Sequence, residues 1–384
     1  MKHIDDYRDG ALARTLAERI ATAAQPDRSY AFMEFCGGHT HAISRYGLED
    51  LLTPAIRLIH GPGCPVCVLP VGRLAAAIDL AKTQSVTLCV YGDLMRVPTA
   101  RGYSLLSAKA DGADIRMIYS PLDAVRMAEQ NPTREVVFFA IGFETTAPAT
   151  AQAILLAERK KLSNFSIICN HVLTPPAMDA IMASPGATPT TMLDGFIGPA
   201  HVATVTGLAP FEQITRRYVK PVVIAGFEPL DVLQAILMLM RQIHEGRADI
   251  ENQYRRAVSS SGNRLAQAAV AQVFNLRDSF EWRGLGVVAD SALRLNERYA
   301  HFDAEQRYPI PIPHIEDNPA CACGEILRGV KKPTDCRLFG TACTPETPIG
   351  SCMVSSEGAC AAHWAYGRFR DKNHRPCAEQ ENSL

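Results

Sequence analysis

The sequence predicts an α/β protein with two Rossmann-like parallel-sheet domains, followed by a cysteine-rich C-terminal domain. Three observations support this fold class. Short apolar runs alternate with helix-period stretches, this alternation stops near residue 305, and cysteines are concentrated beyond that point. A chain of 384 residues is also too long for one ordinary core. We therefore expect domains at 1–130, 131–300 and 301–384.

The apolar runs predict the strands, and the stretches between them predict helices. Strands are expected at 30–35, 56–59, 86–91, 135–141, 165–169, 195–197 and 222–225. Helices are expected at 71–83, 121–129, 148–161 and 229–244. The last three begin with proline, which suits the first helical turn. Such strand–helix alternation favours parallel sheets.

Composition excludes several classes of protein. The formal net charge is −1, so no basic field for nucleic acid is present. No apolar run approaches the roughly 18 residues that span a bilayer, and the N-terminal residues lack the apolar core of a signal peptide. We expect a cytoplasmic protein that binds neither nucleic acid nor membrane.

The 12 cysteines are distributed unevenly. Seven lie within 321–377, and three more lie in two glycine-rich motifs nearer the N-terminus. In a reducing cytosol, such clusters indicate metal binding or redox chemistry rather than structural disulfides. The remaining two, Cys89 and Cys169, lie inside apolar strands and are expected to be core residues.

The tail follows a stiff, proline-rich linker at 308–313 and has no periodic apolar pattern. Four thiolates would suffice for a [4Fe–4S] cluster or a structural zinc ion. The spacings lack the paired knuckles of structural zinc, which favours the cluster. Zinc and unrelated free thiols remain alternatives, and Cys377, in a polar terminus, is expected to be a free surface thiol.

The first glycine-rich motif is Cys36-Gly-Gly-His39-Thr-His41, directly after a predicted strand. Ligands of α/β proteins bind at this end of strands. One thiol with two imidazoles offers soft and borderline ligands for iron, copper or zinc. The alternative is a tight turn with a buried cysteine.

The second motif, at 60–67, ends in Cys64-Pro-Val-Cys67 and also follows a predicted strand. A thiol near a helix N-terminus has a lowered pKa, which favours thiolate chemistry. The pair could form a reversible disulfide or hold a metal. The alternative is two inert thiols.

Polar residues also follow several predicted strands. Carboxylates at these positions could orient ligands or move protons, but isolated acids are often capping or surface groups. A histidine there is more often a hydrogen-bonded loop residue than a ligand. These residues are Glu34, Asp93, Glu144, Glu228, His171 and His201.

Together the motifs resemble the HypD family of [NiFe] hydrogenase maturation proteins. The similarity rests on motifs spread in family order over nearly the whole chain. They lie at 36–41, 61–67, 142–146, 225–231, 251–256, 281–286 and 353–360. The resemblance implies two α/β domains and a C-terminal [4Fe–4S] domain.

The resemblance also implies a function, as an assembly scaffold with redox chemistry rather than a conventional turnover enzyme. Such proteins work with the chaperone HypC to build the Fe(CN)₂CO group, with cyanide from HypE. Cys36 would hold the iron beside His39, and Cys64 and Cys67 would be a redox pair. The implied cluster ligands are Cys323, Cys336, Cys343 and Cys360, with Cys352 as an extra thiol nearby.

We expect the Cys64 and Cys67 thiolates to give two electrons to the bound iron group and the cluster to return them singly. His39 and Glu357 are candidate proton or orienting groups. Two other functions remain open at this point. They are a zinc-stapled, non-redox binding module and a general thiol–disulfide reductase.

Overall fold

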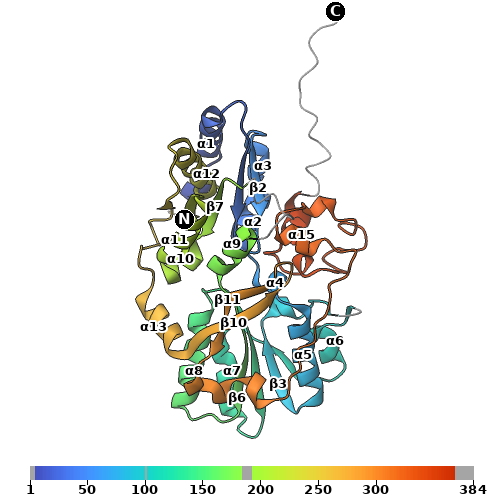
Figure 1. Cartoon of the computed structure of the whole chain (residues 1–384). Helices are drawn as coiled ribbons and strands as arrows, with labels where there is room; N and C mark the ends of the chain where they lie inside the picture. Colours follow the sequence, from blue (N-terminus) through green and yellow to red (C-terminus); the bar gives the residue numbers. More distant parts are fainter. Residues whose placement is uncertain (1–4, 100–101, 184–192, 368–384) are drawn as a thin grey trace, which may run out of the picture.

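The computed structural model describes residues 5–99, 102–183 and 193–367. Two parallel sheets lie one above the other in Figure 1, with an antiparallel hairpin between them and a C-terminal unit of short helices at the side. Sheet A contains β1 (Tyr30–Glu34), β2 (Ile56–His60), β7 (Gly195–Pro199), β8 (Val222–Ala225) and β9 (Ile250–Asn252). Sheet B contains β3 (Val86–Val90), β4 (Ile115–Met117), β5 (Glu135–Gly142) and β6 (Phe165–His171).

Sheet A has the strand order β2-β1-β7-β8-β9, and every pair is parallel. This is a doubly wound order, in which the direction of winding reverses between β1 and β7. Glu34 at the end of β1 pairs with Ile197 of β7. A crevice at the carboxyl ends of two such strands is the usual ligand position in open α/β sheets.

Sheet B has the order β4-β3-β5-β6 and reverses between β3 and β5. Its strands β3, β5 and β6 are buried on both faces, as expected for a parallel sheet covered by helices, whereas the edge strand β4 is largely exposed. The predicted α/β class with Rossmann-like sheets is therefore confirmed. The predicted core residues Cys89 and Cys169 are fully buried within β3 and β6.

The sheets interleave along the chain and do not follow the ranges 1–130 and 131–300. β3 and β4 precede residue 130 but lie in the sheet of β5, while β7 and β8 follow it but join β1. The ranges assume that consecutive segments share a domain. The chain instead leaves sheet A after β2, builds sheet B, and returns to complete sheet A.

Helices cover both sheets. α1 and α12 pack together over one apolar face of sheet A, and α7 and α8 cover sheet B. α5 packs on β3, in the core cluster on the other face of sheet B, and the remaining helices of the described residues are shorter than α5. In chain order the helices are α1 (Gly10–Ala23), α2 (Gly37–Tyr46), α3 (Leu48–Leu51), α4 (Pro65–Val68), α5 (Val71–Thr83), α6 (Leu105–Ala110), α7 (Pro121–Gln130), α8 (Ala147–Arg159), α9 (Thr174–Ala183), α10 (Ala200–Thr206), α11 (Glu212–Tyr218), α12 (Pro229–His244), α13 (Arg264–Val273), α14 (Ala304–Arg307), α15 (Cys323–Leu327) and α16 (Ala359–Ala362).

A hairpin of β10 (Phe274–Trp282) and β11 (Gly286–Leu295) connects the sheets to the C-terminal unit. Arg283 lies in the turn of this hairpin, and its backbone N–H donates to the carbonyl of Val68 in α4 (2.8 Å). Arg328 of the C-terminal unit donates to the carbonyl of Gly284 (3.1 Å). The turn therefore holds the Cys64–Cys67 segment and the cysteine-rich unit in one arrangement.

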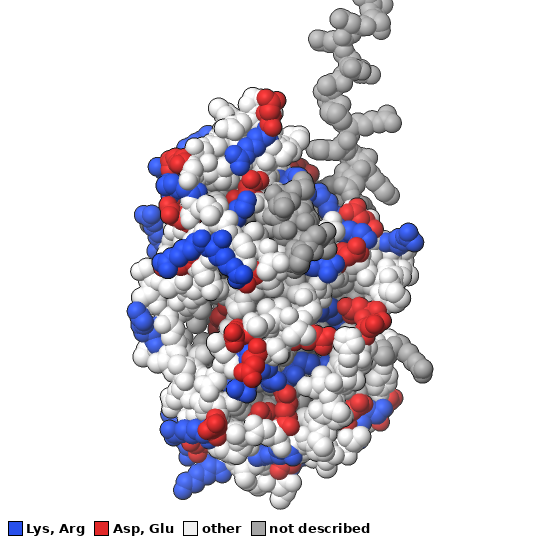
Figure 2. All heavy atoms as spheres, in the orientation of Figure 1, with Lys and Arg blue, Asp and Glu red and all other residues white. Residues whose placement is uncertain are grey.

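Charges of both signs are interspersed over the face shown in Figure 2, with no large single-sign field. No helix of the described ranges is long and apolar enough to cross a membrane.

The linker after residue 308 crosses α5 at Gly72. A Cβ atom at this position would overlap with the carbonyl oxygen of Pro313. We predict that Gly72→Ala destabilises the protein by about 1–3 kcal/mol, because overpacking outweighs the roughly 1 kcal/mol gain in helix propensity. Urea unfolding measures the change.

Gly10→Ala is the matched control, because a Cβ at the start of α1 meets only the end of the Arg14 side chain at 3.7 Å. It should not lower stability. Equal stability of Gly72→Ala and the wild type would show that the linker does not pack on α5 in solution.

Candidate functional site

Cys36 lies at the point where sheet A reverses its winding, directly after β1 and at the N-cap of α2. Its Sγ accepts a hydrogen bond from the N–H of Gly38 (3.2 Å). The side chain is 4% exposed. Burial raises the pKa of the Cys36 thiol, and the charges of Glu34 and Glu357 raise it further. In the protein alone the group is a neutral thiol, and bound metal would convert it to the thiolate.

The ring of His201 lies against the Cys36 sulfur. Its Nδ1 is 3.6 Å and its Nε2 3.8 Å from Sγ. His201 follows β7, the neighbour of β1, so the two side chains enter the crevice from the two strands at the reversal. Burial lowers the pKa of His201 to about 4. Sequence reasoning gave His201 no role, since a single histidine after a strand is a weak signal.

His39 is fully buried and turned toward β8. Its Nε2 lies 3.1 Å and 3.0 Å from the carbonyl oxygens of Ala225 and Gly226. Because carbonyl oxygens only accept, Nε2 carries the proton. Its Nδ1 is buried and has no hydrogen-bond partner among the described residues. Burial lowers the pKa of His39, so the ring is a neutral acceptor at Nδ1.

Glu34 ends β1 and organises the loop that carries Cys36. Its carboxylate accepts hydrogen bonds from the Cys36 N–H (2.8 Å) and from the Thr40 hydroxyl. His60, at the end of β2, donates from Nδ1 to the same carboxylate (2.8 Å). The predicted acid at this strand end therefore acts as a structural anchor of the site.

Cys64 and Cys67 form a disulfide across the first turn of α4. The Cys64 residue precedes the helix, and its Sγ accepts from the Cys67 N–H (3.2 Å). Both residues are at most 3% exposed. Gly63 abuts the backbone of Cys36, where any Cβ atom would overlap with the Cys36 nitrogen. The two N-terminal motifs are thus in direct contact.

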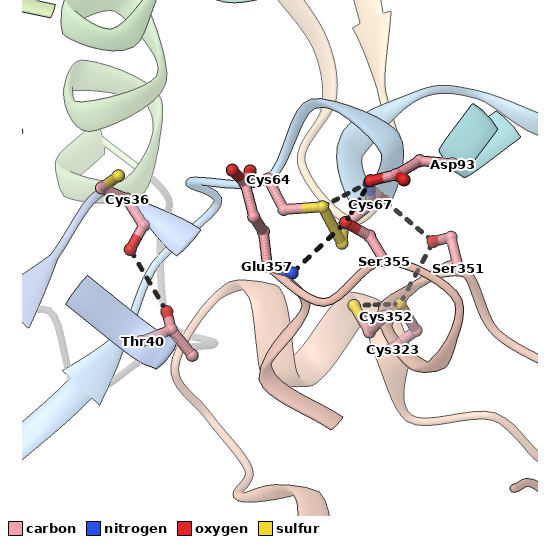
Figure 3. The surroundings of a disulfide bond; sticks show 10 residues. All are labelled: Cys36, Thr40, Cys64, Cys67, Asp93, Cys323, Ser351, Cys352, Ser355 and Glu357. Carbon is pink, nitrogen blue, oxygen red and sulfur yellow. Dashed lines mark hydrogen bonds between the residues drawn. A yellow bond between two sulfur atoms is a disulfide. The ribbon is translucent and has the colours of Figure 1, made fainter. Parts of the chain in front are cut away.

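Glu357 comes to this site from the C-terminal unit. Its main chain and Cβ lie against Gly37, leaving no room there for a side chain. In Figure 3 the Glu357 side chain extends between Cys36 and the Cys64–Cys67 disulfide. Burial, and then the charge of Asp93, raises the pKa of Glu357. A carboxyl group with a raised pKa in this position is suited to proton transfer.

Asp93, after β3 of sheet B, joins the same site indirectly. The Ser355 hydroxyl donates to its carboxylate (3.3 Å) and accepts from the Glu357 N–H (3.3 Å). Other predicted strand-end groups lie outside this network. Glu144 accepts from the N–H and hydroxyl of Thr174, and the Glu228 carboxylate pairs with Arg8.

His171 also lies outside the network, at the end of β6. It contacts the hydroxyls of Thr146 (3.4 Å) and Thr150 (2.9 Å). Burial lowers its pKa to about 4. It behaves as the hydrogen-bonded histidine that its isolated position in the sequence favoured.

The C-terminal unit encloses a small cavity lined by six thiols and by apolar side chains. The four predicted ligands all line it. Two more thiols, Cys321 and Cys352, line it as well. The cysteines are Cys321, Cys323, Cys336, Cys343, Cys352 and Cys360, and the apolar walls include Ile326, Phe339 and Met353. Cys377 lies outside the described residues.

Two of these sulfurs are in contact, with Cys323 Sγ 2.8 Å from Cys352 Sγ. Hydrogen bonds with Cys321 and then with Cys352 lower the pKa of Cys323, and the contact with Cys323 raises the pKa of Cys352. In the described residues, no group of three or more His, Cys, Asp or Glu side chains is arranged to hold a single metal ion. The donor set, six soft ligands around an apolar cavity, fits a thiolate-bound cluster.

Ser351 links this cavity to the disulfide. Its hydroxyl donates to the carbonyl oxygen of Cys67 (3.2 Å) and lies 3.8 Å from Cys323 Sγ. In Figure 3 Ser351 lies beside the disulfide and the Cys323–Cys352 pair, and dashed lines join it to Cys67 and to Cys323. The sequence held no signal for this role, because a serine beside a cysteine is common.

The structure thus defines a class of protein: a two-sheet α/β protein in which three thiol sites follow one another from a strand crevice to a cysteine-lined cavity. Comparison with known proteins identifies it further. Residues 11–367 match the family model described as HypD, "Hydrogenase formation hypA family".

Relatives named "Hydrogenase maturation factor HypD" match almost end to end. That of Rhizobium leguminosarum bv. viciae is 65% identical over 374 residues, 97% of each chain. That of Cupriavidus necator is 60% identical over 373 residues, 97% of this chain and 98% of the relative. That of Escherichia coli K12 is 44% identical over 371 residues, 95% of this chain and 98% of the relative. The chain belongs to the HypD family, and its function is hydrogenase maturation.

The His60–Glu34 pair predicts a pH dependence of stability. Burial alone would lower the pKa of His60, but the hydrogen bond and charge of Glu34 outweigh it and raise the pKa. The pair therefore stabilises the fold fully below about pH 6.5, and this stabilisation is lost as the pH rises through the raised pKa. We predict that His60→Gln costs more unfolding free energy at about pH 6 than at about pH 9.

Urea unfolding at each pH measures the difference. His314→Gln is the control, because the His314–Glu281 pair is exposed and contributes little. An equal loss for His60→Gln at both pH values would contradict the assignment of His60 as the proton-binding partner of Glu34.

Proposed function

We propose that this chain is the scaffold on which the Fe(CN)₂CO group of [NiFe] hydrogenases is assembled, together with the chaperone HypC. The iron group is the cargo, held between Cys36 and a cysteine of HypC, with HypE as the cyanide donor. The observation that carries the proposal is the direct contact between the Cys36 loop and the Cys64–Cys67 segment at Gly63. A redox pair touching a buried soft ligand is suited to an electron-rich iron centre.

The redox step uses the dithiol form of Cys64 and Cys67. Closing this dithiol to the disulfide releases two electrons to the cargo and two protons. Glu357, between the pair and Cys36, is the proposed acceptor for a proton, and the buried Nδ1 of His39 is a second. Opening the disulfide again takes up two electrons and two protons.

We further propose that the cavity of the C-terminal unit holds a [4Fe–4S] cluster. When bound, such a cluster would supply single electrons for reopening the disulfide. The proposed ligands remain Cys323, Cys336, Cys343 and Cys360. Cys352, whose Sγ lies 2.8 Å from that of Cys323, is the extra thiol that could replace one of these ligands. Ser351 offers a hydrogen-bonded connection from the cavity to Cys67.

Burial argues against a general thiol–disulfide reductase. Cys64 is 3% exposed and Cys67 is not exposed at all. A generic protein disulfide could not reach these sulfurs without opening the fold. The zinc alternative would leave the disulfide without an electron source, and metal analysis separates it from the cluster. The cytoplasm remains the proposed location, on the sequence alone.

We predict that Cys64→Ala or Cys67→Ala abolishes hydrogenase maturation, because the two-electron step needs both thiols. The brown chromophore of the anaerobically purified protein should be unchanged. Hydrogenase activity in a host lacking its own copy, and the visible spectrum, measure the two effects. Cys89→Ala, which alters only the core of β3, should preserve both. Loss of the chromophore in either motif variant would show that the thiol groups are wrongly assigned.

Single Cys→Ser substitutions of the six cavity thiols test which of them bind the cluster. Loss of the visible absorption and of bound iron is expected for the four proposed ligands. Cys321→Ser and Cys323→Ser form the decisive comparison, because these thiols are neighbours in sequence and both line the cavity. If Cys323→Ser retains iron and Cys321→Ser loses it, Cys321 rather than Cys323 is the cluster ligand. Zinc in place of iron throughout would reject the cluster.

A further inference from the structure

The crevice between β1 and β7 contains an imidazole that the proposed function does not use. His201 lies in the first turn of α10, directly after β7, and both of its ring nitrogens lie within 4 Å of Cys36 Sγ. The ring of Phe227, after β8, packs on His201 with a centroid distance of 5.2 Å. The imidazole is thus held beside the thiol by a neighbouring strand rather than by the Cys36 loop itself.

We propose that His201 is the second protein ligand, beside Cys36, of the iron that this crevice holds. The inference rests on the proposed role of Cys36 and deepens it by completing the binding site. Metal binding here forms two bonds, from the Cys36 thiolate and from one nitrogen of the neutral imidazole. The thiol proton leaves to solvent, and no electrons are transferred.

The separation of the two groups fits ligands of one metal ion. Sulfur and nitrogen bound at about 2.3 Å and about 2.05 Å to a tetrahedral metal lie about 3.6 Å apart. The observed distance from Cys36 Sγ to His201 Nδ1 is 3.6 Å. The separation therefore suits two ligands of one metal ion, once the His201 ring turns so that one nitrogen lone pair faces the thiol; at present both nitrogens are almost equally far from the sulfur. Two protein ligands also leave positions open for the cyanide and CO of the cargo and for a partner cysteine.

The position in the fold supports the same assignment. Cys36 and His201 come from the two strands between which sheet A reverses, and helices that follow such strands leave on opposite sides of the sheet. The resulting crevice is where ligands of this fold class bind. His201 reaches it from β7, whereas the Nε2 of His39 is engaged by the carbonyls of Ala225 and Gly226.

This arrangement gives His39 a different part in the site. Its ring packs on Phe227 at 4.8 Å, and Phe227 in turn packs on His201. His39 is therefore a positioning residue that holds the Gly226–Phe227 loop against the crevice. It orients the ligand His201 through Phe227, and residues that contact metal ligands commonly orient them in this way.

Anaerobic titration with Co²⁺ tests the proposal. Cobalt is the probe because it accepts tetrahedral sulfur and nitrogen ligands and absorbs visible light when bound to them. The full chain is used with its C-terminal cluster reconstituted and with Cys64 and Cys67 oxidised, so that these thiols do not compete. The wild type should show a thiolate-to-cobalt band that Cys36→Ala removes.

His201→Ala should weaken cobalt binding at least about 10-fold, since loss of a residue that only contacts a metal ligand already costs that much affinity. His201→Cys should bind cobalt with a stronger thiolate band, because it supplies a second sulfur, which a purely structural role would not produce. His41→Ala is the matched control. His41 lies on α2 two residues from His39, but it contacts Tyr366 (3.1 Å) and should bind cobalt as the wild type does.

The outcomes separate this inference from the proposed function. If Cys36→Ala loses the band while His201→Ala keeps wild-type affinity and His201→Cys keeps the wild-type spectrum, His201 is not a ligand and Cys36 retains its role. If Cys36→Ala binds cobalt normally, or the wild type shows no band, both assignments fall. Cyanide and CO vibrations of the protein purified with HypC give an independent measure. They should shift in Cys36→Ala and in His201→Cys.

Discussion

The approach of Gly63 to the backbone of Cys36 is the constraint on which the rest of the site depends. Without a side chain at this position, the loops after β1 and β2 lie in contact, and the disulfide segment begins beside the crevice thiol. Gly37 plays the same part toward the C-terminal unit, since Glu357 occupies the space of its missing Cβ. Three segments distant in sequence therefore meet at distances that only glycine permits.

Much of the fold follows from local sequence signals. The strands β1, β3 and β8 are buried throughout and mainly apolar, and their positions in the sequence agree with the structure to within a residue. The hairpin of β10 and β11 escaped prediction because its exposed positions interrupt the apolar pattern. The interleaving of the two sheets was also beyond local reasoning. Nothing in a strand's own residues states which of two sheets it will join.

The residues of the candidate site also fall into two groups, those that the sequence identifies and those that only the fold reveals. Cysteine motifs identified Cys36 and the Cys64–Cys67 pair, because thiols in glycine-rich turns are chemically conspicuous. Ser351 was not identified, and His201 was named only as a histidine more typical of a loop than of a ligand, because each acts through a neighbour that only the fold supplies. The contact of Cys323 with Cys352 is likewise a product of packing in the C-terminal unit. Spacing in the sequence gives the number of thiols but not their partners.

The interleaved sheets have a consequence for the order in which the protein is made. Sheet B is assembled from consecutive strands, so all four of its strands are translated before the strand β7 that sheet A needs. β1 and β2 must wait for β7, whose Gly195 pairs with Phe32. Glu357 arrives later still. The thiols at the N-terminal end are thus translated first but enclosed last, so a chain that stops before Glu357 lacks the finished crevice.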